Sequence, residues 1–136
     1  MSLFDVFNLS SSALTAQDIR LGTIAKNIAN SESISSTPEG TYRAQTPIFK
    51  AVYDEFASSN DVAVKVVGIA EDQSPPQKQY DPGNPLADDD GFIYMPNINR
   101  VEEMSNMMSA SRSFQINIEM MNTSKELLIR TLTLGQ

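Results

Sequence analysis

The chain has 136 residues, which is enough for one domain with a modest hydrophobic core. Seventeen acidic residues against ten basic ones give a formal charge of −7, which disfavours binding to nucleic acid and to anionic lipid surfaces. The sequence has no cysteine and no histidine, which removes disulfides, thiolate metal ligands and the usual general base at neutral pH. The composition therefore predicts no enzyme, no metal, no cofactor and no small-molecule substrate.

The N-terminal stretch MSLFDVFNLSSSALTAQ lacks the basic segment and the continuous apolar segment of a cleavable signal peptide. No run in the sequence approaches the roughly 18 consecutive apolar residues that a membrane-spanning helix needs. We therefore expect no direct membrane insertion. If the protein leaves the cytoplasm, we expect a route that requires no cleaved signal.

The first predicted element is a helix over residues 3–30. One heptad position of this helix holds Leu3 and Ile24 but is interrupted by the polar residues Ser10 and Gln17. Gly22 lies inside the helix and costs about 1 kcal/mol relative to alanine, which weakens the prediction of an unbroken helix. Apolar residues recur every seven positions at Phe7, Leu14, Leu21 and Ile28.

The middle segment, residues 31–96, contains all seven prolines of the chain. Polar stretches at 31–40 and 71–91 indicate loops. Pro47, inside the first predicted strand, favours an edge strand or a bulge. The segment is thus predicted to be a small β-rich domain with linkers. Its strands are predicted at 42–56, 61–69 and 92–95.

The last segment, residues 97–136, is predicted to be a helix that Asn97 or Asn99 can cap and that continues to about Leu134. In addition to two heptad positions, the helix has apolar residues that widen its apolar surface beyond what one partner helix covers. Together with the first helix, this segment predicts an α+β fold in which two long terminal helices form a coiled-coil-like pair. One heptad position holds Met104, Ser111, Ile118, Lys125 and Leu132; a second, wholly apolar one holds Met107, Phe114, Met121 and Leu128; Met108, Ile116, Met120, Leu127, Ile129 and Leu134 lie outside both.

The last helix is too long for a compact molecule of this size. About 37 helical residues make a rod of about 55 Å, whereas a compact chain of this length has a radius of gyration of about 14 Å. The first helix, at about 40 Å, covers only part of that rod. Other chains must cover the rest, and adaptable methionine side chains suit several different neighbours. The predicted contacts between subunits are Phe7, Leu14, Leu21, Ile28, Met107, Phe114, Ile118, Met121, Leu128 and Leu132.

Two loop motifs are candidate binding sites. The stretch LADDDGF places Leu86 and Asn97 where a calcium-binding EF-hand loop needs acidic ligands, so we interpret it as a solvated acidic turn. The stretch YDPGNPL is a rigid turn, either structural or a contact loop. Neither a phosphate-binding glycine motif nor a nucleophile–base pair occurs in the sequence.

Four stretches together resemble the axial rod proteins of the bacterial flagellar basal body, most closely the C-type proximal rod members. They are SSALTAQDIRLGTIAKNIAN, YDPGNPLADDDGFIYMPNIN, EEMSNMMSASRSFQINIEMMN and the closing TLTLGQ. The sequence departs from the family pattern after Asn30, where SESISSTPE precedes Gly40-Thr41-Tyr42. The residues that match family motifs are Asn27, Ala29, Asn30, Tyr42, Pro82, Gly83, Asn84, Pro85, Pro96, Asn97 and Arg112.

The resemblance implies a structural subunit of the proximal rod, located in the basal body where the rod crosses the periplasm. It implies terminal helices that form the inner tube of the rod, with copies of itself and other rod and basal-body proteins as partners. It also implies export by the flagellar type III apparatus without a cleaved signal. The alternative from the residues alone is a free-standing secreted binding or adaptor module that uses the middle β domain and folds its helices into a private bundle.

Overall fold

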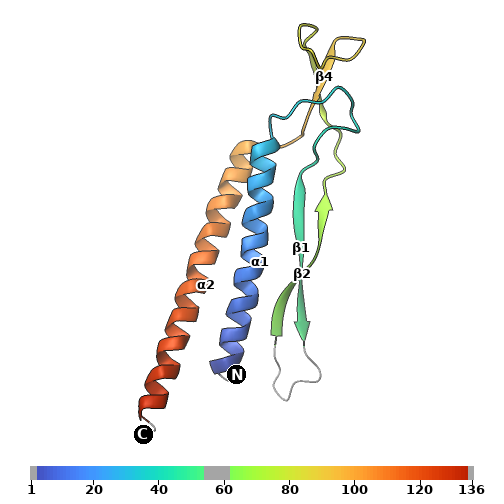
Figure 1. The fold of residues 1–136 in the computed structure, drawn as a ribbon. Coiled ribbons are helices and arrows are strands. Elements are labelled where there is room, and N and C mark those ends of the chain that lie inside the picture. The colour runs from blue at the N-terminus through green and yellow to red at the C-terminus, as the bar shows by residue number, and fades with distance from the viewer. Residues whose placement is uncertain (1–2, 54–61, 135–136) are drawn as a thin grey trace.

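A computed structural model describes residues 3–53 and 62–134 and has the α+β fold that the sequence predicts. Two long helices enclose, in the order of the chain, two separate antiparallel hairpins (Figure 1). The elements are α1 (Leu3–Asn30), β1 (Gln45–Tyr53), β2 (Val62–Glu71), β3 (Gln77–Tyr80), β4 (Phe92–Met95) and α2 (Arg100–Leu134).

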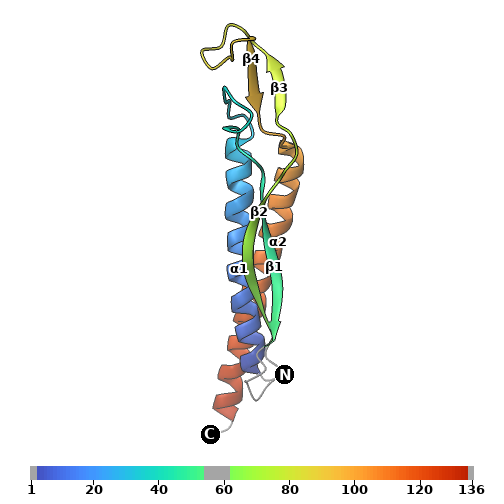
Figure 2. The same ribbon diagram turned by 90° about the vertical axis from the view of Figure 1, so that its right-hand side faces the viewer.

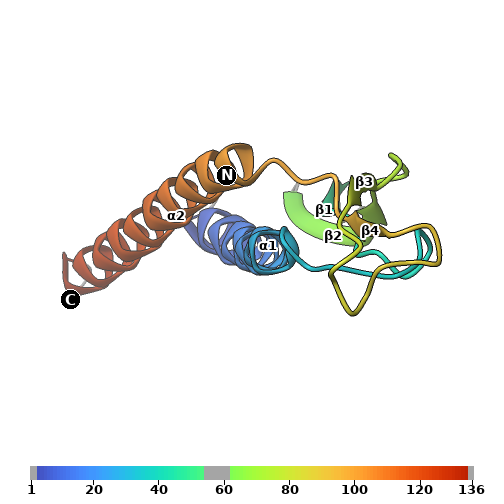
Figure 3. The same cartoon turned by 90° about the horizontal axis from the view of Figure 1, so that it is seen from above.

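The molecule is elongated, and α1 lies between α2 and the β1–β2 hairpin (Figures 1 and 3). The β3–β4 hairpin lies beyond the end of the helical pair where α1 ends and α2 begins (Figure 2). We call this hairpin and its connecting loop, residues 77–95, the head. By residue count α1 is about 42 Å long and α2 about 52 Å, and α2 extends past the N-terminal end of α1 (Figure 1).

Helix α1 has the predicted bounds and passes through Gly22 without a break. An ideal Cβ built on Gly22 would have no neighbour within 4 Å, so no close approach requires glycine there. Residues 1–2 of the predicted N-terminal segment lie outside the described residues.

Helix α2 begins at Arg100, three residues later than the predicted segment boundary at 97. Asn99 is the capping residue, because its Oδ1 accepts hydrogen bonds from Val101 N at 3.1 Å and Glu102 N at 3.3 Å. Asn97 instead accepts a hydrogen bond from Gln77 Nε2 at 3.2 Å and so ties the chain to the head. Residues 135–136 of the predicted helix lie outside the described residues.

The β1–β2 hairpin pairs Gln45 with Glu71 at one end and Tyr53 with Val62 at the other. The register shifts between Ile48 and Phe49, which confirms the irregularity predicted from the neighbouring Pro47. The predicted strand residues 54–56 and 61 lie outside the described residues.

The sequence prediction was wrong at 77–80, where the structure has strand β3 instead of a loop. Its residues QKQY are all exposed and lack the apolar alternation that marks a strand. Pairing with β4 and side-chain contacts hold the strand: the Tyr80 and Phe92 rings meet edge to face at 5.2 Å, and Lys78 Nζ lies 3.8 Å from the centre of the Phe92 ring. The four strands therefore form two separate hairpins and no common sheet.

The hydrophobic core of the described residues is small. The apolar residues that are buried there are Ala16, Ile24, Ile93 and Ala110, and Ala110 is fully inaccessible. Ser10, Thr23 and Ser124 on the two helices are also buried. The buried residues of the two helices are therefore few and mostly small, and most of their large apolar side chains stay at least partly exposed.

Candidate functional site

One buried amide joins three elements at the head end of the helical pair. Asn27 is 2% exposed; its Nδ2 donates to Gln45 O at 2.9 Å and to Glu103 Oε2 at 3.1 Å. Its Oδ1 accepts from Tyr42 OH at 2.9 Å and from Gln45 N at 2.9 Å. All four hydrogen-bonding positions of the side chain are thereby used. We call Asn27, Tyr42, Gln45 and Glu103 the joint, because they fix α1 against β1 and α2.

The hydroxyl of Tyr42 is held in its protonated form within this joint. Burial raises the pKa of Tyr42, and the negative charges of Glu103 and Glu71 raise the pKa further. The hydroxyl therefore remains a donor to Asn27 over the whole neutral range.

A second, more exposed contact spans the same end of the two helices. Arg100 Nη2 lies 2.7 Å from Glu32 Oε1, and Arg100 Nε and Nη2 each donate to Ser31 Oγ at 3.2 Å. The side chains of Arg100 and Glu32 are 46% and 73% exposed, so solvent screens this ion pair and its contribution is modest.

The other tie between the β1–β2 hairpin and α1 lies near the opposite end of α1. Ser12 Oγ accepts a hydrogen bond from Val64 N at 3.1 Å and donates to Leu9 O at 2.8 Å. The hairpin is thus attached to α1 at both ends, by Ser12 and by the joint.

The loop of the head is organised by a single carboxylate. Asp88 accepts hydrogen bonds from Phe92 N at 2.7 Å, Asp90 N at 3.1 Å and Tyr94 OH at 3.1 Å. These donors lower the pKa of Asp88, with the Phe92 amide making the largest contribution. The acidic stretch is therefore a structural turn around Asp88, as the sequence interpretation had it, with Asp89 and Asp90 exposed to solvent.

The proline-rich motif in the same loop also forms local turns. Asn84 Oδ1 accepts from Leu86 N at 3.0 Å, and Asn84 N donates to Asp81 O at 3.2 Å. Gly91 adopts φ of 80°, and a Cβ there would lie 3.0 Å from Tyr80 Cε2, so both backbone conformation and space require glycine. These contacts give residues 82–85 a structural role in the head.

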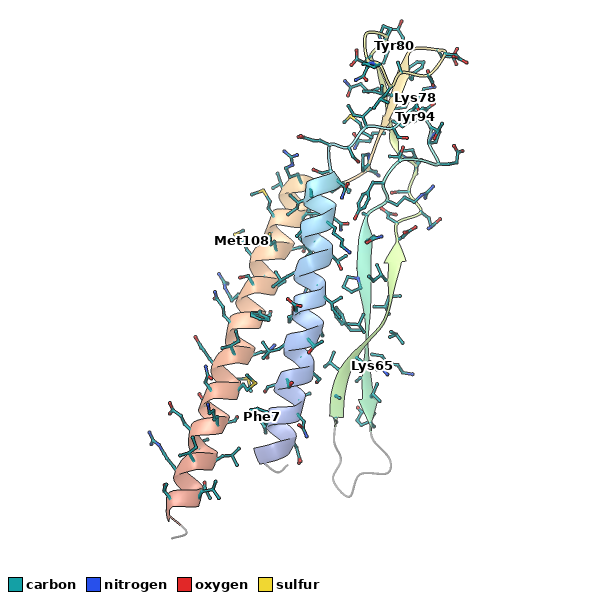
Figure 4. All side chains as sticks on the ribbon, in the orientation of Figure 1. Phe7, Lys65, Lys78, Tyr80, Tyr94 and Met108 are labelled. Carbon is teal, nitrogen blue, oxygen red and sulfur yellow. The ribbon has the colours of Figure 1, made fainter. Side chains whose placement is uncertain are left out.

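The helical pair presents a large apolar surface to solvent. We call the exposed apolar side chains of α2 the assembly surface. Met108 projects from the outer side of α2 (Figure 4) and is 68% exposed, and Leu132 near the C-terminal end is 72% exposed. A monomeric protein rarely exposes this much apolar side-chain surface along one helix unless the surface meets another molecule. The surface comprises Val101, Met104, Met107, Met108, Ile116, Met120, Leu127, Ile129 and Leu132.

Part of the assembly surface lines an open groove between α1 and α2. The groove has a volume of about 850 Å³ and is mostly apolar. Small residues on the α1 side leave room for a side chain or a helix from elsewhere. The lining residues are Leu21, Gly22, Ala25, Met104, Met107, Met108, Ser111, Arg112 and Gln115.

The residues predicted to contact other subunits divide into two groups. Phe7, Met107 and Leu132 are exposed in the single chain and are available to a partner. The remainder are half-buried in the single chain. This second group consists of Leu14, Leu21, Ile28, Phe114, Ile118, Met121 and Leu128.

The predicted motif residues are spread over the molecule. Asn27 and Tyr42 meet in the joint, Asn97 contacts the head, and Arg112 lines the groove. Asn30 Nδ2 donates to Lys26 O within α1, Ala29 is exposed, and Pro96 is buried next to the head. The motif residues therefore mark several structural features and no single pocket.

Several exposed apolar side chains of α2 lie outside the predicted contact set. Val101, which is 77% exposed, precedes Met104, the first residue of the predicted heptad positions. Met108, Ile116, Met120, Leu127 and Ile129 were recognised as apolar but lie outside the two heptad positions. The breadth of the apolar surface, and not the heptad repeat, is the sequence feature that identifies these residues.

Within residues 3–53 and 62–134, neither helix has a stretch that is apolar enough and long enough to cross a membrane.

Two family models match the terminal segments of the chain. The family description "Flagella basal body rod protein" matches residues 7–32, and "Flagellar basal body rod FlgEFG protein C-terminal" matches residues 89–134. The two matches cover almost all of α1 and α2, and they assign the chain to the class of flagellar basal-body rod proteins.

Full-length relatives narrow this class. The chain is 45% identical over 136 residues to the flagellar basal-body rod protein FlgC of Salmonella typhimurium, and 42% identical over 136 residues to that of Yersinia enterocolitica. Over 138 residues it is 39% identical to FlgC of Buchnera aphidicola subsp. Schizaphis graminum, and each alignment covers 100% of both chains. The chain belongs to the FlgC family of flagellar basal-body rod proteins, and it is a structural component of the flagellar basal-body rod.

Proposed function

We propose that the chain polymerises through its terminal helices, with copies of itself and with other rod proteins, into the drive shaft of the flagellum. In this proposal the helices form the inner part of the proximal rod across the periplasm, and the hairpins lie outside. Torque passes through many moderate contacts, so no single contact has to be strong. A heterologous contact that does not close on itself generates a helical assembly.

The observation that supports this proposal is the exposure of the assembly surface in a single chain. Leu132 and Met108 lie on opposite halves of α2, and both are more than two-thirds exposed at 72% and 68%. Fully burying a side chain of this size contributes about 1.5 to 3 kcal/mol. The small core of the single chain leaves that free energy to be gained from neighbours.

The same balance supports export before assembly. Long helices gain most of their stability from packing, and among the described residues of the two helices the buried apolar ones are Ala16, Ile24 and Ala110. We therefore expect the ends of the helices away from the head to be only partly formed in the isolated chain and to order at the growing end of the rod. Passage through the flagellar type III apparatus without a cleaved signal fits a chain that is readily unfolded.

Substitution of an exposed residue tests the proposal most directly. Leu132→Asp and Met108→Asp place a charge where the single chain has solvent, so the folded monomer loses little. Each variant should abolish or strongly reduce recovery of the chain in purified basal bodies and swimming in soft agar, because burial of an unpaired charge is very costly.

The matched control is Asn122→Asp, an exposed polar position of the same helix. It should assemble normally. Normal swimming of cells with Leu132→Asp and Met108→Asp combined would contradict the proposal. A stable, compact and fully helical monomer at high concentration, seen by light scattering and circular dichroism, would instead favour the free-standing adaptor.

A further inference from the structure

The β1–β2 hairpin places two like charges directly opposite each other. Lys50 of β1 is the register partner of Lys65 of β2, and both side chains are exposed. Like charges in direct cross-strand pairing destabilise a hairpin. Neither lysine forms an ion pair within residues 3–53 and 62–134. In an acidic chain with ten basic residues, this pair is an unusual concentration of positive charge.

The two lysines lie on the outward face of the hairpin, among exposed aliphatic groups. Residues at alternate positions of a strand share a face, so Ile48 and Val52 flank Lys50. They are 50% and 38% exposed, whereas Pro47 on the opposite face is buried. Figure 4 shows Lys65 on the side of the hairpin away from α1. We call Ile48, Lys50, Val52 and Lys65 the lysine face.

The head presents the complementary chemistry. Asp89 and Asp90 are exposed, and Leu86 in the same loop is 48% exposed. Asp88 is occupied by its hydrogen bonds to Phe92 N and Tyr94 OH, so the turn is held in a fixed shape. Two carboxylates beside one aliphatic side chain match two ammonium groups beside two aliphatic side chains.

Within one chain these two surfaces cannot meet. The head lies beyond the end of the helical pair, whereas the lysine face lies alongside α1 (Figures 1 and 2). Contact between them therefore requires a second copy. The contact is heterologous, since each copy offers one of each surface, and such contacts continue from copy to copy.

We propose that the lysine face of one copy docks onto the acidic head loop of a neighbouring copy, as a contact between the outer parts of adjacent subunits. This inference rests on the proposed polymerisation and adds to it a polar contact that involves neither helix. Charge complementarity of this kind sets register and orientation more than affinity. In the assembly, the head carboxylates also relieve the repulsion between Lys50 and Lys65.

Thiol cross-linking tests this contact without removing any charge. The chain has no cysteine, so introduced thiols are unique. Ala63→Cys lies two residues before Lys65, and Ala87→Cys lies just before the acidic turn. In basal bodies from cells with both substitutions in one chain, a short bis-maleimide should give covalent dimers and a ladder of higher products. Each single-cysteine variant is the matched control and should give no ladder.

Charge exchange provides the second measurement. Lys50→Glu with Lys65→Glu should reduce incorporation into basal bodies about threefold, as expected for two exposed charge pairs. Asp89→Lys with Asp90→Lys should give a similar loss, and all four substitutions in one chain should restore most of it. Glu39→Lys, an exposed carboxylate elsewhere, is the control and should have no effect.

The outcomes separate this inference from the proposed function. If the double-cysteine chain is present in basal bodies but gives no product beyond the single variants, the docking contact is overturned and helix-driven assembly stands. Lys50→Glu with Lys65→Glu could reduce incorporation into basal bodies without Asp89→Lys and Asp90→Lys restoring it. That result would assign the lysine face to another partner and would also overturn the inference. If the chain with Leu132→Asp and Met108→Asp combined still enters basal bodies normally, it is the proposed helix-driven assembly that fails.

Discussion

The two ends of the helical pair are stabilised in different ways. At the head end, Asn27 and Arg100 make specific polar contacts that join α1, α2 and β1. Toward the opposite end, Met121 and Leu128 are only half-buried, and Leu127, Ile129 and Leu132 are exposed. Gln17 Oε1, near the middle of α1, is buried and accepts no hydrogen bond from the described residues.

This difference shows what a subunit must complete by itself and what it can leave to neighbours. A buried polar group without a partner costs about 1 to 3 kcal/mol, so the joint has to be satisfied within the chain. Apolar contact is not directional, and any neighbour of suitable shape can complete it. The head end therefore defines the geometry of one subunit, while the other end is open to assembly.

The substitutions with the largest expected effect disrupt the part of α2 that is open to assembly. Leu128→Asp or Phe114→Asp places a charge at a half-buried position that contributes within the chain and, in our proposal, between chains. Either variant should abolish swimming and incorporation into basal bodies. Leu128→Met, which nearly conserves volume, should keep both. Normal motility with either aspartate would show that this end of α2 is not in contact with neighbours.

The substitution with the next largest expected effect disrupts the joint. Asn27→Leu leaves Gln45 N and the Tyr42 hydroxyl without their partner, and should lower the free energy of unfolding by about 2 to 4 kcal/mol. Denaturant titration followed by circular dichroism measures it. The control is Asn30→Leu, because Asn30 donates only to Lys26 O within α1 among the described contacts. If the two variants were equally stable, the joint would have no special role.

A smaller effect sharpens the contrast at the head end. Arg100→Ala removes the contact with Glu32 and Ser31, and because both charged groups are substantially exposed it should cost at most about 1 kcal/mol. The loss should shrink at high salt, since exposed ion pairs are screened. A loss as large as that of Asn27→Leu, or one that is independent of salt, would contradict this account.

The smallest and most local effect concerns pH and the head loop. Folding lowers the pKa of Asp88 below its ordinary value of 3.8, chiefly because Phe92 N donates to it. The stabilisation is therefore complete above the unfolded pKa of about 3.8 and is lost as the pH falls through the lower folded pKa. The amide resonance of Phe92 should titrate in that acidic window, and Asp88→Asn should remove the titration. A midpoint above 4 would show the opposite shift.

Much of the fold followed from local patterns in the sequence. The bounds of α1, strand β4 and the bulge beside Pro47 were predicted because heptad spacing, β-branched or aromatic density and proline geometry act over a few residues. Strand β3 was missed because QKQY has no such pattern. It is a strand because β4 and the Phe92 ring lie beside it.

The sequence by itself determined that the terminal helices have more apolar surface than one chain can cover, since helix length and the number of apolar residues are local properties. Which of those residues are buried in the single chain and which face solvent was decided by the tertiary structure, because the rotation of α2 against α1 buries Ala110 completely and leaves Met108 and Leu132 exposed. The joint was likewise beyond sequence reasoning. Asn27 reaches Gln45 and Glu103 across 18 and 76 residues of chain, and only the folded arrangement brings them together.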